Sequence, residues 1–241
     1  CPGIIGVDEA GRGCLAGPVV AGAVLLKNEF FKHRGNRKSC SMVNDSKQLK
    51  EKQREDLFEQ IQKLGEKGDL FWAFGEASVE EIEAENIVGA TCLAMKRAME
   101  RVSLSSKEIW KPDLTLNKDL FADAMSRKEN TWVVSVDGRP MKKLPFQHEG
   151  LIKGDTFSLA IAMGSIVAKV TRDRLMRKLA LVYNGYDFAS NKGYGSPKHL
   201  VGLQENGPCI HHRPRFLRKI LNCGAEKKSN EEDSQSQLSF S

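Results

Sequence analysis

Residues 3–13 read GIIGVDEAGRG, a short apolar run that ends in two adjacent carboxylates and an arginine between two glycines. A continuous apolar run bounded by glycines is typical of a strand covered on both faces, so residues 4–7 predict a buried central strand. Successive strand side chains point to opposite faces of a sheet. We therefore expect the strand to bend or end between Asp8 and Glu9, so that both carboxylates reach one site, and the two following glycines permit that bend.

The chain after this corner alternates between strand-like and helix-like patterns. Residues 18–26 are rich in valine and small residues and predict a second strand, antiparallel to the first. Further strands are expected at 70–77 and 131–137. Helices are expected at 49–63 and 158–177, and one or two helices at 80–102, with a last helix starting at Ser196-Pro197 and stopping at Gly207-Pro208. Ser46 or Asp45 is expected to cap the helix at 49–63. Small residues in the helix at 158–177 predict that it packs closely on the sheet.

Charge and cysteine content narrow the class of protein. The chain has 241 residues and a formal net charge of +6, which suits one main domain and favours a polyanionic partner. Its six cysteines include no C-x-x-C pair, so we interpret them as reduced thiols of a cytoplasmic protein. No apolar run is long enough to span a membrane and no signal-peptide pattern opens the chain, so we expect no membrane partner.

Four acids each lie at or just past the end of an apolar segment: Asp8, Glu9, Asp137 and Asp155. Open α/β sheets place their sites at such strand ends. Clustered carboxylates repel one another, and proteins usually bring them together around hard divalent cations, which can activate water and clamp a phosphodiester. The alternative is that Asp137 and Asp155 are ordinary turn or helix-cap residues, since Asp-Gly and Asp-Thr are common turn dipeptides.

Seven short blocks follow one another in a recognisable order: VDEAGRG at 7–13, LAGPVV at 15–20, NDSKQL at 44–49, VDG at 136–138, KGD at 153–155, IVAKVTRDR at 166–174 and KGYG at 192–195. Together they resemble the signature of type 2 ribonucleases H, in particular bacterial ribonuclease HII, over most of residues 3–215. The resemblance implies a ribonuclease H-like α/β fold, in which helices flank a mixed sheet and a C-terminal helical region follows. We accordingly expect a catalytic domain at 1–180, a substrate-binding helical region at 181–221 and a disordered tail at 222–241.

The resemblance also implies an activity and a set of site residues. The enzyme would cut the RNA strand of RNA:DNA hybrids, or the 5′ side of a ribonucleotide embedded in duplex DNA, with Mg²⁺ or Mn²⁺ as cofactor. Apart from the resemblance, we expect a monomer. The catalytic, metal-binding acids would be Asp8, Glu9, Asp137 and Asp155. The substrate-binding residues would be Gly11, Arg12 and Gly13 at the 2′-hydroxyl, Tyr194 against the following sugar, and Asn44, Ser46 and Lys47 at the phosphates, with Thr171, Arg172 and Lys192 as weaker candidates.

Other features leave alternatives open. A ribonuclease HIII-like enzyme that prefers long hybrids, and a non-catalytic nucleic-acid-binding module on the same fold, are the two rival interpretations. Lys169 and Asp173 stand at i and i+4 of one helix, which predicts an internal ion pair. His211 and His212 are interpreted as a basic, partly exposed pair near the DNA, because nothing nearby supplies further soft metal ligands.

Overall fold

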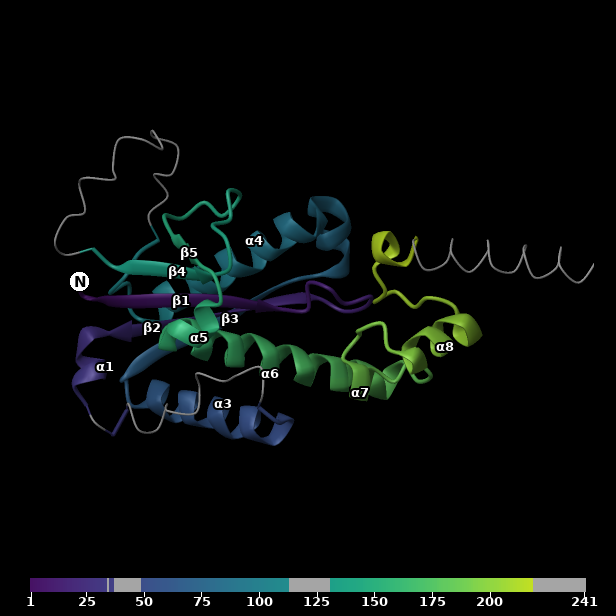
Figure 1. Cartoon of the computed structure of the whole chain (residues 1–241), viewed down its shortest axis with the longest axis horizontal. Helices are drawn as coiled ribbons and strands as arrows, with labels where there is room; N and C mark the ends of the chain where they lie inside the picture. Colours follow the sequence, from purple (N-terminus) through teal and green to yellow (C-terminus); the bar gives the residue numbers. More distant parts are fainter. Residues whose placement is uncertain (34, 37–48, 113–130, 219–241) are drawn as a thin grey trace, which may run out of the picture.

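The computed structural model describes residues 1–33, 35–36, 49–112 and 131–218. Five strands form one mixed sheet in the order β3-β2-β1-β4-β5 (Figure 1). The strands are β1 (Gly3–Ala10), β2 (Val19–Lys27), β3 (Leu70–Ala77), β4 (Val133–Asp137) and β5 (Glu149–Leu151). The opening stretch therefore supplies the central strand, as its apolar run predicts.

The sheet is antiparallel on one side of β1 and parallel on the other. β1 pairs antiparallel with β2, and β2 pairs antiparallel with β3. β4 runs parallel to β1, and β5 runs parallel to β4. The register that pairs Val7 with Val136 brings Asp8 and Asp137 next to each other, one step further along two parallel strands. Two of the carboxylates expected at strand ends, Asp8 and Asp137, are therefore neighbours in the sheet.

Helices cover both faces of the sheet (Figure 1). The helices are α1 (Asn28–Lys32), α3 (Glu51–Glu66), α4 (Val79–Ser105), α5 (Gly154–Phe157), α6 (Leu159–Val182), α7 (Phe188–Asn191) and α8 (Pro197–Asn206). Alternate residues of β2 serve the two layers: Ala23 belongs to the apolar cluster under α4, and Val24 to the cluster under α3 and α6. Burial on both faces explains why β2 is apolar from Val19 to Leu26 rather than alternating.

Glycines let α6 approach the sheet very closely. A Cβ added at Gly6 would stand 2.1 Å from the backbone carbon of Ala160, and one added at Gly22 would stand 2.2 Å from the carbonyl oxygen of Gly164. Neither position tolerates a side chain, because the obstructing atoms belong to helix backbone. The close packing predicted from the small residues of this helix is confirmed, and it brings α6 directly over the end of β1.

The C-terminal helical region has a small core of its own. Tyr186, Phe188 and Leu203 bury against Leu15 and Ala16 of the loop that follows β1. At the start of α8 the Ser196 hydroxyl accepts a hydrogen bond from the His199 amide, as the sequence predicts. Gly207, with φ +68°, ends this helix at the predicted position. Figure 1 shows α7 and α8 beyond the end of the sheet, on the side where β1 ends.

Two local expectations are wrong. β1 does not end or bend between Asp8 and Glu9 but stays paired with β2 as far as Ala10. α3 begins at Glu51 behind Lys50, whose amide donates to Gln53, so neither Asp45 nor Ser46 caps it. Among the described residues no helix has the length and apolarity needed to cross a membrane.

Candidate active site

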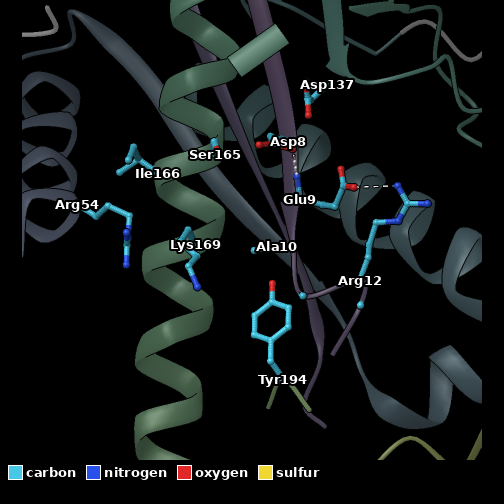
Figure 2. Close-up of a pocket in the computed structure, with 12 residues that line it drawn as sticks. Asp8, Glu9, Ala10, Arg12, Arg54, Asp137, Ser165, Ile166, Lys169 and Tyr194 are labelled. Carbon is cyan, nitrogen blue, oxygen red and sulfur yellow. Dashed lines mark hydrogen bonds and ion pairs between the residues drawn. The ribbon is translucent and has the colours of Figure 1, made fainter. Parts of the chain in front are cut away.

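A pocket of about 400 Å³ opens where β1, β4 and α6 meet the C-terminal region (Figure 2). Its walls combine acids, bases, bare backbone and one aromatic ring. They are formed by Asp8, Glu9, Ala10, Gly11, Arg12, Gly13, Arg54, Asp137, Ser165, Ile166, Lys169 and Tyr194. The structure thus brings together seven of the eleven residues expected at the site.

Asp8 and Glu9 both reach this pocket although they leave opposite sides of β1. The Asp8 carboxylate accepts a hydrogen bond from the Glu9 amide at 2.7 Å and another from the Ser165 hydroxyl of α6. Glu9 turns the other way and accepts a hydrogen bond from the Arg12 guanidinium at 3.0 Å (Figure 2). The pocket wraps around the end of the strand, so no bend is needed for both acids to line it.

Burial and mutual repulsion make ionisation of these acids costly. Burial, followed by the charges of Glu9 and Asp137, raises the pKa of Asp8 from 3.8 to about 8 against the opposing effect of its hydrogen bonds. Burial also raises the pKa of Glu9, while the hydrogen bond and charge of Arg12 oppose that rise. Acids with pKa values displaced in this way are typical of functional sites.

Asp137 and Asp155 are connected through the start of α5. The Gly154 amide donates a 2.7 Å hydrogen bond to Asp137 Oδ1, and Asp155 follows directly on the same short helix. Asp155 is 3% exposed and is not among the residues that line the pocket. The structure therefore places three of the expected acids at the pocket wall and the fourth buried beside it.

The carboxylate oxygens of this pocket are the kind of ligand that hard divalent cations prefer. As their side chains stand, no three His, Cys, Asp or Glu residues of the described ranges are arranged to hold a metal ion. The repulsion that raises the pKa of Asp8, however, comes from Glu9 and Asp137, and a cation among these oxygens would relieve it. Oxygen-only donors match Mg²⁺ and Mn²⁺ rather than softer metals.

The opposite wall is basic and aromatic. Lys169 donates a 2.8 Å hydrogen bond to Asp173, so the ion pair predicted from their spacing is confirmed. Lys169 and Tyr194 are neighbours, with the ammonium 5.9 Å from the ring centroid, and the Tyr194 hydroxyl points into the pocket (Figure 2). Tyr194 is 46% exposed, which leaves its ring accessible to a ligand.

The glycine corner, which consists of Gly11, Arg12 and Gly13, is held on its buried side by an arginine. Gly11 has φ +93°, and a Cβ there would stand 2.0 Å from Nε of Arg172. Arg172 is 1% exposed and donates to the carbonyls of Ala16, Pro18 and Lys192. Its expected contact with a phosphate is therefore wrong, because all three donor nitrogens face the interior. Lys192 is also buried, with its ammonium on the Ala189 carbonyl.

Three expected phosphate contacts, Asn44, Ser46 and Lys47, lie outside the described residues. The expectation for His212 is wrong: its side chain is 3% exposed and forms a hydrogen bond with the buried His199. Arg54 and Ser165 line the pocket and were not anticipated. Ser165 stands in the stripe of small residues noted in its helix, which was a usable signal, whereas nothing local distinguishes Arg54 from the other charges of α3.

Solved structures of type 2 ribonucleases H share this fold. The ribonuclease H2 of Pyrococcus horikoshii OT3 matches with a TM-score of 0.61 and 22% identity, over 90% of this chain and 96% of that one. The Archaeoglobus fulgidus ribonuclease HII in its complex with PCNA matches with a TM-score of 0.60 and 22% identity, over 88% of this chain and 92% of that one. Bst-RNase HIII in complex with Mn²⁺ matches with a TM-score of 0.55 and 16% identity, over 85% of this chain and 63% of that one.

Sequence relatives are more similar. Ribonuclease HII of Fusobacterium nucleatum is 42% identical over 226 residues, which is 93% of this chain and 90% of the relative. Ribonuclease HII of Caldanaerobacter subterraneus is 39% identical over 218 residues, 90% of this chain and 75% of the relative. The family model described as ribonuclease HII matches residues 5–219, which include every block that carries the resemblance. The chain therefore belongs to the ribonuclease HII family.

Proposed function

We propose that the pocket hydrolyses phosphodiester bonds of RNA strands paired with DNA, cutting RNA:DNA hybrids and the 5′ side of ribonucleotides embedded in duplex DNA. The protein is a metal-dependent endoribonuclease of the ribonuclease H type. Products would carry a 3′-hydroxyl and a 5′-phosphate. The observation that carries this proposal is the shared pocket, in which Asp8, Glu9 and Asp137 face the glycine corner and Tyr194.

Asp8, Glu9, Asp137 and Asp155 are the residues proposed to hold the divalent cations. Bound Mg²⁺ or Mn²⁺ supplies Lewis-acid polarisation of the scissile phosphate and a lowered pKa for the attacking water. The chain's own groups prepare the acids for this task. The Gly154 amide fixes Asp137, and the Glu9 amide fixes Asp8, so two carboxylates are oriented before any ligand arrives.

Substrate selection is assigned to the corner and the aromatic ring. Gly11, Arg12 and Gly13 would contact the 2′-hydroxyl largely through backbone groups, and that hydroxyl is what distinguishes RNA from DNA. Support comes from Gly13, where an added Cβ would meet no atom within 4 Å, so a sugar can approach the bare backbone. Tyr194 would place its exposed ring against the sugar that follows the ribonucleotide. Asn44, Ser46 and Lys47 stay candidates for phosphate contacts on the strength of the resemblance alone.

The proposed organisation is a catalytic domain at 1–180, a substrate-binding region at 181–221 and a tail at 222–241. The chain would act as a monomer. A cytoplasmic location is proposed from the bacterial relatives. Light scattering after size-exclusion chromatography, with and without a hybrid duplex, tests the monomer.

The deciding experiment uses a DNA duplex with one ribonucleotide, incubated with Mg²⁺, Mn²⁺ or EDTA. We expect metal-dependent cutting on the 5′ side of the ribonucleotide, and loss of at least a hundredfold in rate for Asp137→Asn. Asp56→Asn, which changes an exposed acid of α3, serves as the matched control. Cutting that survives EDTA or Asp137→Asn would refute the proposal, and cutting of long hybrids alone would favour the ribonuclease HIII-like rival.

A further inference from the structure

Two histidines form a buried pair behind Tyr194. The Nε2 atoms of His199 and His212 lie 3.0 Å apart, and the two side chains are 0% and 3% exposed. Tyr186 and Phe188 pack on the pair, with ring centroids 4.8 Å from His212 and 5.2 Å from His199 respectively. The pair thus sits in an aromatic box closed to solvent.

The backbone groups at the two ends of this pair determine its protonation. The Cys209 amide can only donate, and it donates to Nδ1 of His212 at 2.9 Å, so the His212 proton must lie on Nε2. That Nε2–H donates to Nε2 of His199, which places the His199 proton on Nδ1. Nδ1 of His199 lies 2.7 Å from the carbonyl oxygen of Tyr194, which can only accept. Only this combination of tautomers gives a hydrogen-bond partner to all four ring nitrogens, the Cys209 amide and the Tyr194 carbonyl. In this combination both rings are neutral.

The electrostatics of the box agree with this assignment. Burial, followed by repulsion from His199, lowers the pKa of His212 to about 4. Burial also lowers the pKa of His199, against its hydrogen bond to the Tyr194 carbonyl and the charge of Asp187. A proton added to either ring would bring two N–H groups face to face.

The pair bridges two parts of the substrate site. On one side the segment of His212 is bonded to the loop after the glycine corner: the Gly17 amide donates to the His211 carbonyl, and the Arg213 amide donates to the Leu15 carbonyl. On the other side His199 binds the Tyr194 carbonyl, which also accepts from the Ser196 amide. The backbone of Tyr194 is therefore tied to the corner through the histidines, in addition to the hydrogen bonds that the Leu15 and Ala16 amides donate to the Gly193 carbonyl.

We propose that the neutral His199–His212 pair is a positioning device that sets Tyr194 relative to the glycine corner, and so determines selectivity for a ribonucleotide–deoxyribonucleotide junction. Neither histidine touches substrate. The inference rests on the proposed role of Tyr194, because only a ring that senses the junction gives its placement a consequence for selectivity. The role is one of positioning rather than chemistry.

The chain of hydrogen bonds is tested first, by ¹⁵N-histidine NMR of the full chain at pH 7 and pH 5. We expect one ring protonated on Nδ1 and the other on Nε2, with both rings neutral at pH 5. His199→Phe and His212→Phe identify the signals and retain aromatic volume. Two identical tautomers, or a ring that titrates with a pKa near 6.5, would overturn the proposal.

The consequence for Tyr194 is tested by kinetics. We expect His199→Phe to lower kcat/KM on the single-ribonucleotide duplex by about tenfold relative to a long hybrid. His199→Asn places an amide donor where Nδ1 stood and is expected to restore part of that ratio, which a purely structural role would not predict. His33→Phe, at the exposed C-terminal end of α1, is the control. Equal losses on both substrates would overturn the inference.

A second readout separates this inference from the proposed function. ¹³C-tyrosine NMR, with the Tyr194 signal assigned from Tyr194→Phe, reports on the ring without any substrate. His199→Phe should shift that signal, and an unchanged signal would overturn the positioning role. If Tyr194→Ala leaves the ratio of the two substrates unchanged while His199→Phe shifts the ring, the proposed junction role of Tyr194 fails and the effect on selectivity fails with it.

Discussion

Replacing Asp8 by asparagine should stabilise the fold while it removes activity. Asp8 is 6% exposed, and the charges of Glu9 and Asp137 add to the cost of burying it, so its pKa rises from 3.8 to about 8. Asparagine has nearly the same shape, carries no charge and still offers an oxygen to the Glu9 amide. The variant therefore removes the repulsion and keeps the hydrogen bond.

The sign and size of the effect follow from linkage. A folded-state pKa above the unfolded one means that the native state binds the proton more tightly, so ionisation of Asp8 costs stability as pH rises from about 4 to about 8. The displacement corresponds to roughly 6 kcal/mol as an upper bound, since each pKa unit is about 1.4 kcal/mol. Relaxation and water entry reduce such costs, so we expect a gain of about 2 kcal/mol at pH 8.5, or roughly 4–8 °C in Tm.

Thermal unfolding in EDTA at pH 5.0, 7.0 and 8.5 measures this difference. The advantage of Asp8→Asn should be largest at pH 8.5 and small at pH 5.0, and Mg²⁺ should stabilise the wild type more than the variant. Asp56→Asn is the control, since Asp56 is exposed and its removal should not produce a pH-dependent gain. A variant that is less stable than wild type at pH 8.5, or an advantage independent of pH, would refute the electrostatic reasoning.

Three further substitutions probe the scaffold and the corner. Gly6→Ala should destabilise the protein by about 3 kcal/mol in urea unfolding, because the new Cβ would meet the Ala160 backbone at 2.1 Å. Gly35→Ala is the control and should change little, because a Cβ added at Gly35 would meet no atom of a non-neighbouring residue within 4 Å. Arg172→Met should cost about 3 kcal/mol or more in the same assay, since three buried carbonyls lose their donor; a neutral result would show that water replaces it. Gly13→Ala should leave unfolding unchanged and slow cleavage at an embedded ribonucleotide at least tenfold, and a wild-type rate would exclude close approach of the sugar there.

The sequence allowed the sheet and its flanking helices to be predicted because their signals are local. The apolar run before Asp8 marks a strand buried on both faces, and the small residues of α6 mark a close helix–sheet contact. The path of β1 beyond Asp8 differs from the prediction, because both acids can line one pocket without leaving the same face of the strand. In the structure the pocket extends around the end of the strand instead.

Long-range pairings could not be predicted from the sequence. Arg172 looked like a phosphate ligand because it is basic and stands in a family block, yet its partners are carbonyls 20 to 156 residues away. His212 looked exposed because its neighbours are basic, yet it pairs with a histidine 13 residues earlier. Whether a charged or titratable side chain faces solvent is decided by the tertiary contacts of its whole segment, and no short window contains them.

Arginines, rather than regular secondary structure, hold the corner in place, and this has a consequence for recognition. Arg213 is fully buried and donates to the carbonyls of Arg12 and Gly17, while Arg172 holds those of Ala16 and Pro18. In a trans peptide the N–H points opposite to the C=O. Because the carbonyl of Arg12 is turned toward the buried guanidinium, the amide of the next residue, a bare glycine, is directed away from the interior. The corner can therefore present a backbone donor to a sugar hydroxyl without reorganising, which is the condition for selective recognition of a group as small as one oxygen.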